Sequence, residues 1–387
     1  MILVGHMRIP SLLCVFLAVC VASISPCLAD GDAGWFDAMH RSGKAAERKA
    51  QPISDRIVVA PVPMVNPTLG AGLIGVGMYM HPKDSFWNDE ASEDNATRQS
   101  ISGIAALAST NGSWGVGAFH KGFYDNDTFR GVAFLAYGDF QLKYFGSGDD
   151  AYLRDNPVGY AAKITAFQPE LMARVEGDWF VGAKYSLFSW DFGADLSKLS
   201  PTLPYLNHTI TTAGLGLVGE RDTTDDSVYP TRGGLFQFEA TDYGGAWGGD
   251  FEYAKASASY AHYFPLTDKL VLAGQGELNL STGSTPFFDM PFLHLRGFPY
   301  AKYIDKQSSS IQGEARYKLS EKWAANIFAG LGWTSGEPGG LYKGPTIPTG
   351  GFGIRYLIAE EQKMYLGMDL AFGPGSTALY FRLGEWF

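Results

Sequence analysis

The most constraining feature of this sequence is an alternation of apolar and polar residues that recurs along most of its length. From residue 57 to residue 387, segments of roughly 9 to 13 residues alternate in this way, separated by Gly, Asp, Asn, Ser or Pro. Alternation gives a β-strand one apolar and one polar face, because successive side chains point to opposite sides. After the N-terminal segment there is no run of about 18 apolar residues, which a membrane-spanning helix would need. The pattern predicts strands and argues against a helical membrane protein.

The segment 269–281 shows the alternation well. One face is apolar and the other polar, with Leu270, Leu272, Leu278 and Leu280 on the first and Gln275, Glu277 and Asn279 on the second. In a membrane barrel the apolar face meets lipid and the polar face meets a wet lumen. A soluble β-sandwich also alternates, so periodicity by itself leaves both architectures open.

We predict about sixteen strands, an even number as bacterial single-chain barrels have. The predicted segments are 57–65, 69–80, 100–109, 113–123, 129–144, 160–175, 179–192, 209–221, 234–243, 251–264, 269–281, 308–319, 323–334, 349–358, 364–372 and 377–387. They leave no space for a second folded domain beside the barrel.

The first thirty residues resemble an export signal. Arg8 supplies a positive charge, an apolar stretch runs from Leu12 to Ala22, and Cys27-Leu28-Ala29 provides a small-x-small cleavage site. The three cysteines all lie in this segment, so the mature chain is expected to hold neither a disulfide nor a cysteine metal site. A lipoprotein cleaved at Cys27 is the alternative, although Pro26 fits it poorly.

Composition excludes one class of partner. The net charge of −10 argues against nucleic acid, because phosphate binding needs basic patches. Acidic clusters such as Asp149-Asp150 and Asp225-Asp226 are interpreted as solvated turns, with cation binding at the cell surface as the alternative. The 48 glycines and the 14% content of Phe, Trp and Tyr suit a sheet between lipid and water.

These observations predict an exported all-β protein of the bacterial outer membrane. The expected parts are a signal peptide (1–29), a short periplasmic N-terminal segment (30–54) and a transmembrane antiparallel β-barrel of about 16 strands (55–387). Lipid and lipopolysaccharide are then the surroundings of the barrel. The export signal, the lack of mature cysteines and the aromatic end of the chain favour this fold over a soluble sandwich.

The last segment resembles the C-terminal β-signal that the barrel-assembly machinery reads. Its candidate residues are Phe381, Leu383, Gly384 and Phe387. The resemblance implies that this machinery is a partner during biogenesis. An ordinary edge strand that ends on Phe is the alternative.

A second motif is more specific. Arg296-Gly297-Phe298 lies in a long loop that five predicted strands follow. It resembles the Arg-Gly-Phe or Arg-Gly-Tyr motif of the BamA/TamA (bacterial surface antigen) superfamily, in which this loop folds into the barrel lumen. Further similarity lies in Glu314-Ala315-Arg316 and in the stretch from Glu220 to Gly233. The resemblance covers roughly Gly214 to Phe387 well.

Electrostatics indicates partners for Arg296. A cation inside a barrel is partly desolvated and is tolerable only when a carboxylate pairs with it. Alternation places Glu314 and Asp369 on the lumen face, so we expect them to be its acceptors. Family members carry an Asp receptor in a Phe-x-Asp-x-Gly motif, where this chain has Gly330. Either Glu314 or Asp369 takes over that role, or the loop is held less firmly.

The resemblance implies a role in inserting or translocating protein or lipid at the outer membrane, with client proteins as partners and a homodimer as an open alternative. The periplasmic POTRA domains of the assembly members are not expected here. No Gly-x-Ser-x-Gly elbow and no catalytic or metal-ligand spacing of histidines occurs, so neither an enzyme nor a cofactor is expected. A passive porin-like channel or surface antigen without assembly activity is the rival function.

Pro61 and Pro63 suggest where such a barrel would open. Residues two apart direct their backbone groups to the same strand edge, and neither proline has an N–H. If that edge faces the last strand, the closing seam is weakened, and we expect a lateral opening between 57–65 and 377–387. The alternative is that the first strand begins only after Pro63.

Overall fold

The fold was analysed in a computed structural model. It describes residues 56–66, 68–81, 100–148, 151–192, 209–226, 229–336, 344–359, 363–383, 385 and 387. The predicted signal peptide (1–29) and N-terminal segment (30–54) lie outside these residues. Within them, no helix is both long enough and apolar enough to cross a membrane.

The described residues form sixteen strands, as the alternation predicts. Their bounds are β1 Ile57–Asn66, β2 Gly70–Met80, β3 Ile101–Ser109, β4 Trp114–Tyr124, β5 Phe129–Tyr144, β6 Val158–Glu176, β7 Trp179–Phe192, β8 Ile210–Asp222, β9 Gly233–Tyr243, β10 Tyr253–Pro265, β11 Leu270–Gly283, β12 Gln307–Lys318, β13 Trp323–Ser335, β14 Ile347–Ala359, β15 Met364–Gly373 and β16 Ser376–Leu383. The short helices are α3 (Ala151–Asp155), η4 (Gly245–Trp247) and η5 (Phe287–Asp289).

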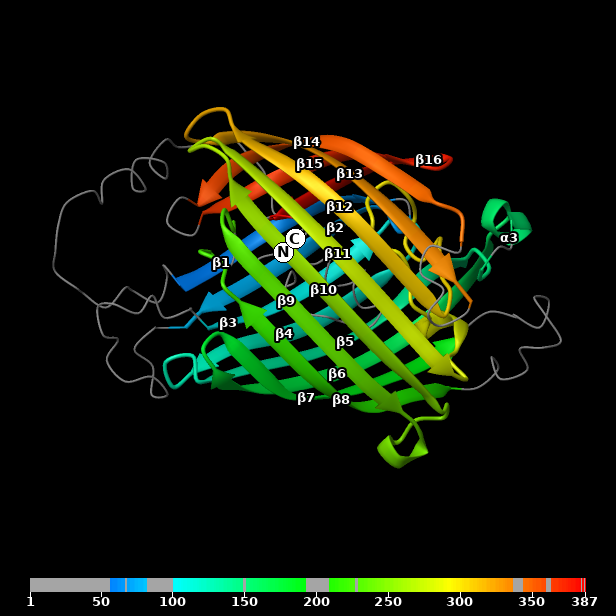
Figure 1. The fold of residues 1–387 in the computed structure, drawn as a ribbon. Helices are drawn as coiled ribbons and strands as arrows, with labels where there is room; N and C mark the ends of the chain where they lie inside the picture. Colours follow the sequence, from blue (N-terminus) through cyan, green and yellow to red (C-terminus); the bar gives the residue numbers. More distant parts are fainter. Residues whose placement is uncertain are drawn as a thin grey trace.

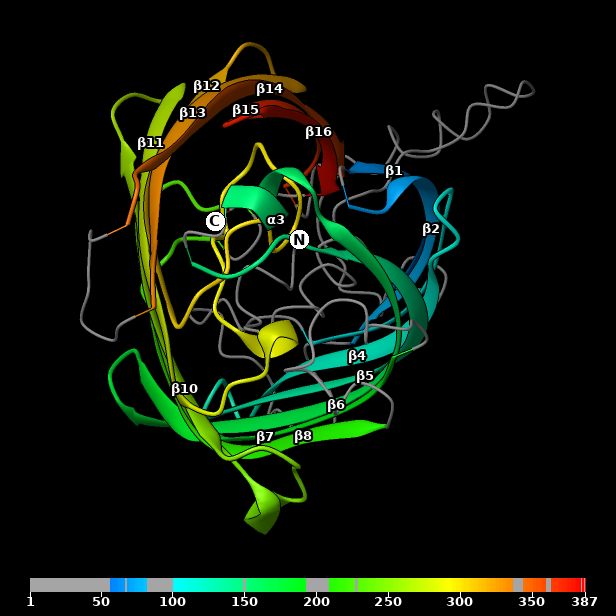
Figure 2. The ribbon, with the colours of Figure 1, turned by 90° about the vertical axis from the view of Figure 1, so that its right-hand side faces the viewer.

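Each strand pairs antiparallel with its neighbour in the sequence, from β1 through to β16. The sheet curls into a tilted, nearly closed barrel, which confirms the predicted fold class (Figures 1 and 2). One strand end differs clearly from the prediction. The last strand stops at Leu383 and not at residue 387, because Glu385 forms ion pairs inside the barrel.

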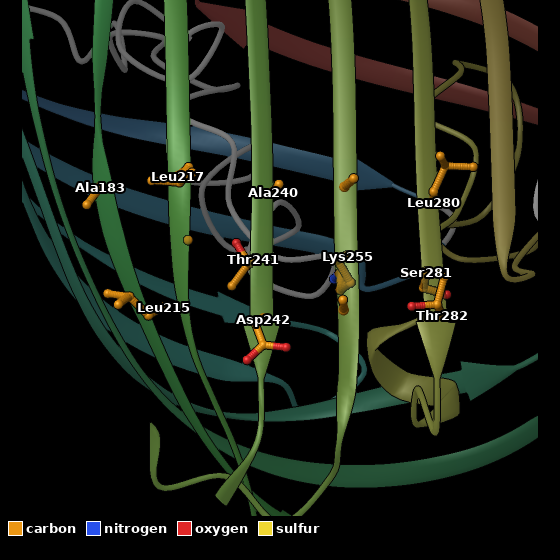
Figure 3. Close-up of a pocket in the computed structure, with 13 residues that line it drawn as sticks. Ala183, Leu215, Leu217, Ala240, Thr241, Asp242, Lys255, Leu280, Ser281 and Thr282 are labelled. Atoms are coloured by element: carbon orange, nitrogen blue, oxygen red, sulfur yellow. The ribbon is translucent and has the colours of Figure 1, made fainter. Parts of the chain in front are cut away.

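The outer wall is apolar, as expected of a lipid-facing surface. Large apolar side chains such as Val59 and Ile327 are 76% and 65% exposed. Across β7 to β11, small side chains such as Ala240 leave a hollow of about 480 Å³ between Leu217 and Leu280 (Figure 3). This hollow lies on the wall, and the functional residues predicted from sequence do not line it.

The inner wall carries both charged and apolar clusters. On the side of β12 to β16 the buried residues include many charged groups, as the alternation predicts. On the side of β2 to β8 part of the inner wall is apolar, and Phe134, Phe188 and Trp190 belong to one buried cluster there. Buried charged residues such as Arg130 and Lys184 lie on the same strands. The lumen face therefore has an apolar part beside the polar part that the alternation predicts. Phe288, which follows β11, packs on Trp190 with ring centroids 4.7 Å apart, so a loop inside the barrel covers part of this apolar wall.

Candidate functional site

The candidate site is built around the loop 284–306, which joins β11 to β12. This loop is seen inside the ring of strands when the barrel is viewed along its axis (Figure 2). It has local structure of its own, since Phe292 and Ile304 form an isolated β-bridge and the Leu293 N–H donates to the Tyr303 carbonyl. A folded loop can place a side chain in one position, which a disordered loop cannot.

Arg296 lies at the centre of this loop and is 1% exposed. Its guanidinium donates from Nη2 to Glu314 at 2.8 Å and from Nη1 to Asp369 at 2.9 Å. The guanidinium carbon also lies 3.3 Å from the ring centroid of Phe328. The structure thus brings Arg296 together with both carboxylates that alternation places on the lumen face.

The ion pairs extend well beyond Arg296. Arg355 Nη1 donates to Asp369 at 2.6 Å and Arg382 Nη2 lies 2.8 Å from the same carboxylate. Arg316 Nε donates to Glu314 at 2.9 Å. Charge-assisted hydrogen bonds of this kind are strong in a dry site, and together they offset part of the free-energy cost of desolvating the ions. We call these residues the lumen network, with Arg296, Arg316, Arg355, Arg382, Glu314, Asp369 and Glu385 as its members.

Glu385 connects the end of the sequence to this network. Arg355 donates to it from Nε at 3.1 Å, and Arg316 Nε lies 3.8 Å from its other oxygen. Two residues later, the carbonyl oxygen of Phe387 accepts from Arg316 Nη2 at 2.9 Å. The chain after β16 therefore turns inward.

Gly297 allows the loop to approach the wall closely. Its φ is +116°, and a Cβ atom there would lie 2.7 Å from the carbonyl carbon of Phe372 and 2.9 Å from the nitrogen of Gly373. Only glycine tolerates both constraints. The neighbouring Phe298 packs edge-on against Tyr303, with centroids 4.9 Å apart. These contacts hold the loop against the β15–β16 hairpin.

Gly330 marks the departure from the family motif. A Cβ atom at Gly330 would lie 3.0 Å from the side chain of Leu295, and one at Gly332 would lie 2.7 Å from Leu293. Loop leucines therefore pack over the two glycines of β13. The loop contacts this strand through apolar packing, while Glu314 and Asp369 supply the charge that a carboxylate at residue 330 would otherwise provide.

Three further polar contacts fix the first half of the loop. Asp289 accepts from the Tyr253 hydroxyl at 2.5 Å and from Lys255 Nζ at 2.7 Å. His294 Nδ1 lies 2.5 Å from Glu277. His294 is thus a paired loop histidine. The loop is attached to β10 and β11 on one side of the lumen and to β15 and β16 on another.

The seam between the first and last strands is a separate feature. Cα atoms of β1 and β16 approach within 8 Å, but within the part of the chain that the structure describes no ladder pairs them. The two strands lie side by side in Figure 2. Strand β1 begins at Ile57 and includes both prolines, so the alternative that it starts after Pro63 was wrong.

The hydrogen-bond pattern shows which way the prolines face. In an antiparallel pair, the N–H and C=O of one residue point to one neighbour and those of the next residue to the other. The carbonyl of Ala71 accepts from Thr110 and the N–H of His81 donates to Ser100, so odd-numbered residues of β2 face β3. Even-numbered residues of β2 then face β1, where they pair with even-numbered residues. Pro61 and Pro63 therefore face the seam.

The same reasoning applies to the other side of the seam. Leu357 donates to the carbonyl of Lys322, so odd-numbered residues of β14 face β13. Following the registers through β15, the odd-numbered residues of β16, such as Leu379 and Phe381, face away from β15. The seam thus has a complete set of N–H donors on β16 and lacks two of them on β1.

The predicted β-signal residues occupy two environments. Phe381 lies in β16, at the seam, whereas Phe387 is 8% exposed and clusters with Tyr263 and Val271 of the opposite wall. The side chain of Leu383 and the whole of Gly384 lie outside the described residues. The alternation of apolar and polar residues predicts strands, and it does not predict the turn after β16 that places Phe387 in the lumen.

Sequence reasoning missed four members of the lumen network: Arg316, Arg355, Arg382 and Glu385. The alternation places Arg316 on the same face as Glu314, which was the one available signal. Arg355, Arg382 and Glu385 come together only because β14, β15 and the end of the chain are adjacent in the barrel.

Comparisons with known proteins agree with this architecture. Residues 160–319 match the Omp85 superfamily domain. A search of curated proteins gives no significant match. Among solved structures, BamA from Haemophilus ducreyi lacking POTRA domains 1–3 is similar, with 13% identity and a TM-score of 0.53 over 85% of this chain and 69% of that one.

Two structures of CdiB are also similar. CdiB from Escherichia coli has 12% identity and a TM-score of 0.54, over 84% of this chain and 62% of that chain. CdiB from Acinetobacter baumannii has 11% identity and a TM-score of 0.51, over 85% of this chain and 59% of that chain. The chain therefore spans about three fifths of the length of these CdiB structures, and at such identities the likeness shows the fold. Residues 160–319 of the chain therefore match the Omp85 superfamily domain, and its described residues form a 16-stranded barrel with the fold of the BamA and CdiB structures.

Proposed function

We propose that this protein inserts or translocates protein substrates, or lipid, at the bacterial outer membrane through the seam between β1 and β16. The observation that carries the proposal is the seam itself. Two adjacent strands lack a ladder in the described structure, and the edge of β1 that faces β16 holds Pro61 and Pro63. A strand edge with unpaired backbone groups is a template for another strand, so it offers an incoming segment a place to pair.

The lumen loop supports this role and disfavours a simple pore. Arg296, Gly297 and Phe298 hold the loop inside the barrel, where it occupies space that water and ions would otherwise fill. We propose that Arg296 is the anchor of the loop, with Glu314 and Asp369 as its acceptors. The anchored loop would stiffen β12 to β16 and leave β1 as the more movable side of the seam.

The proposed partners follow from this location. Lipid and lipopolysaccharide would surround the apolar wall, and unfolded outer-membrane proteins would be the clients. We further propose that the barrel-assembly machinery inserts the chain during its own biogenesis, reading Phe381, Leu383, Gly384 and Phe387. Whether the protein also forms a homodimer can be tested by measuring the mass of the purified protein in detergent.

The test is to reconstitute the protein in liposomes and to measure how fast an unfolded outer-membrane protein inserts, with ion conductance recorded on the same preparation. We expect the wild type to accelerate insertion and Arg296→Ala to lose most of that acceleration, because the loop is released from Glu314 and Asp369. Arg221→Ala is the matched control, since this arginine is exposed and lies outside the lumen network.

Barrel folding must be equal in all three proteins, which the shift in gel mobility on heating reports. Conductance without acceleration in the wild type would exclude the assembly role and favour the rival porin-like channel. If Arg296→Ala still accelerates insertion as the wild type does, the proposed function stands, but anchoring of the loop by Arg296 is not part of it.

A further inference from the structure

The segment 297–302 of the lumen loop contacts both sides of the seam, and we call it the bridge segment. On the β16 side, the Ser376 hydroxyl donates to the Gly297 carbonyl at 2.6 Å, and the Gly297 N–H donates to the Tyr380 hydroxyl at 3.1 Å. Lys302 Nζ donates to the carbonyl of Pro374, in the β15–β16 turn, at 3.0 Å. These bonds attach the bridge segment to the last hairpin of the barrel.

On the β1 side, the contact is made by the β1–β2 turn. The backbone N–H of Tyr300 donates to the hydroxyl of Thr68 at 2.8 Å. Thr68 is 9% exposed, and its carbonyl accepts from Asn111 Nδ2 at 3.3 Å, which links this turn to the β3–β4 turn. The adjacent Leu69 is fully buried in the apolar cluster of the inner wall. The Thr68 hydroxyl is thus held in place by a turn that is itself packed and hydrogen-bonded.

These contacts all lie toward one end of the seam. The β1–β2 turn and the β15–β16 turn are at the same end of the barrel, because β1 and β16 are antiparallel neighbours joined to β2 and β15. At the other end the chain enters β1 at Ile57 and leaves β16 at Leu383. The prolines lie between, in the stretch that lacks donors.

We infer that Thr68 is a positioning residue that lets the bridge segment tie β1 to β16 at the turn end, so that the seam opens from the end where the chain enters and leaves the barrel. This inference rests on the proposed function, because it specifies how that seam would open. On the β1 side the tie includes the neutral hydrogen bond from Tyr300 to Thr68, and on the β16 side four hydrogen bonds join the bridge segment to the last hairpin. Losing the Thr68 bond would weaken the hold on β1 while the loop stays on β16.

The test uses distances between spin labels, measured on the full protein in liposomes by pulsed electron paramagnetic resonance. One label pair at Val65 and Thr377 reports the turn end, and a second pair at Val59 and Phe381 reports the other end. All three natural cysteines precede Asp30, and the unsubstituted protein treated with the label is the blank. Each pair is introduced into the wild type and into Thr68→Val, which keeps the side-chain size and removes the acceptor.

We expect Thr68→Val to raise the separated population of the turn-end pair on the order of two- to tenfold, the ratio set by losing one ordinary hydrogen bond. Thr68→Ser, which keeps the hydroxyl, should restore the wild-type distances. Thr346→Val is the matched control, because its hydroxyl accepts from Trp333 in the β13–β14 connection at 3.0 Å, away from the bridge segment.

An unchanged turn-end distance in Thr68→Val would overturn the inference, and so would an equal change at both ends. If Thr68→Val does not fold, Lys302→Met removes one of the bonds on the β16 side and should raise the separated population of the turn-end pair in the same direction by a smaller factor, because the bonds of Ser376 and Tyr380 remain. The distances need no client protein. A seam that responds as expected without any acceleration of insertion would therefore keep this inference and refute the proposed function.

Discussion

At the residue scale, the chain concentrates its buried charge around one loop arginine. Arg296 contacts Glu314 and Asp369, and those carboxylates also pair with arginines of the wall. Removing one partner of a buried ion pair typically costs about 3 to 5 kcal/mol, because the other is left buried and uncompensated. The network therefore matters more for holding the loop in one place than for adding net stability.

Gly297 provides a prediction at this scale. Gly297→Ala should destabilise the barrel by about 1 to 3 kcal/mol more than Gly112→Ala, because it adds a close contact with Phe372 to the cost of a positive φ. Gly112 also has a positive φ but has open space around it. Urea unfolding in lipid vesicles measures both variants. Equal losses in the two would show that the close approach to the β15–β16 hairpin costs little.

At the scale of elements, the two edges of the seam differ in their chemistry. The edge of β1 lacks two backbone donors because Pro61 and Pro63 face β16, whereas β16 keeps its donors. Strand β16 is also held from inside, through Tyr380 and Arg382. The more weakly held strand is therefore β1.

Restoring the missing donors should close the seam. Pro61→Ala with Pro63→Ala would allow up to two new hydrogen bonds, worth about 1 to 3 kcal/mol together. We expect a narrower distance distribution between labels at Val59 and Phe381, and slower insertion of client protein. Pro169→Ala is the control, because Pro169 lies in β6, which pairs on both sides. A double variant with wild-type distances and rates would argue that the prolines do not govern opening.

At the scale of the whole molecule, the barrel combines an apolar outer wall, an inner wall with an apolar cluster, and a polar network that joins four late strands through one loop. Such a network is shielded from solvent ions, since its members are buried. A pair at the surface, such as Lys363 with Asp226 at 3.1 Å, is not shielded in this way. Salt should distinguish the two kinds of pair.

We therefore expect the loss of thermal stability in Arg296→Ala to be nearly the same at low and high ionic strength. The small loss in Lys363→Ala should disappear in high salt, because screening acts on exposed pairs. The measurement is the temperature of the heat-induced gel shift for each variant at about 0.05 and 0.5 M salt, concentrations that bracket a Debye length of about 10 Å. A strong salt dependence for Arg296→Ala would mean that water and ions reach the lumen network.

The sequence by itself determined the strands, their number and the faces they present, because a period of two is a local property of the chain. It also marked Arg296, Glu314 and Asp369, since alternation and burial of charge limit the acceptors to residues on the lumen face. Only the tertiary structure decided that all three meet, that Arg355, Arg382 and Glu385 join them, and that residue 387 turns inward. Those contacts depend on which strands become neighbours and on how the loop folds, and partners far apart in the sequence leave no local pattern. The direction in which Pro61 and Pro63 face was decided in the same way, by the register of β1 on β2.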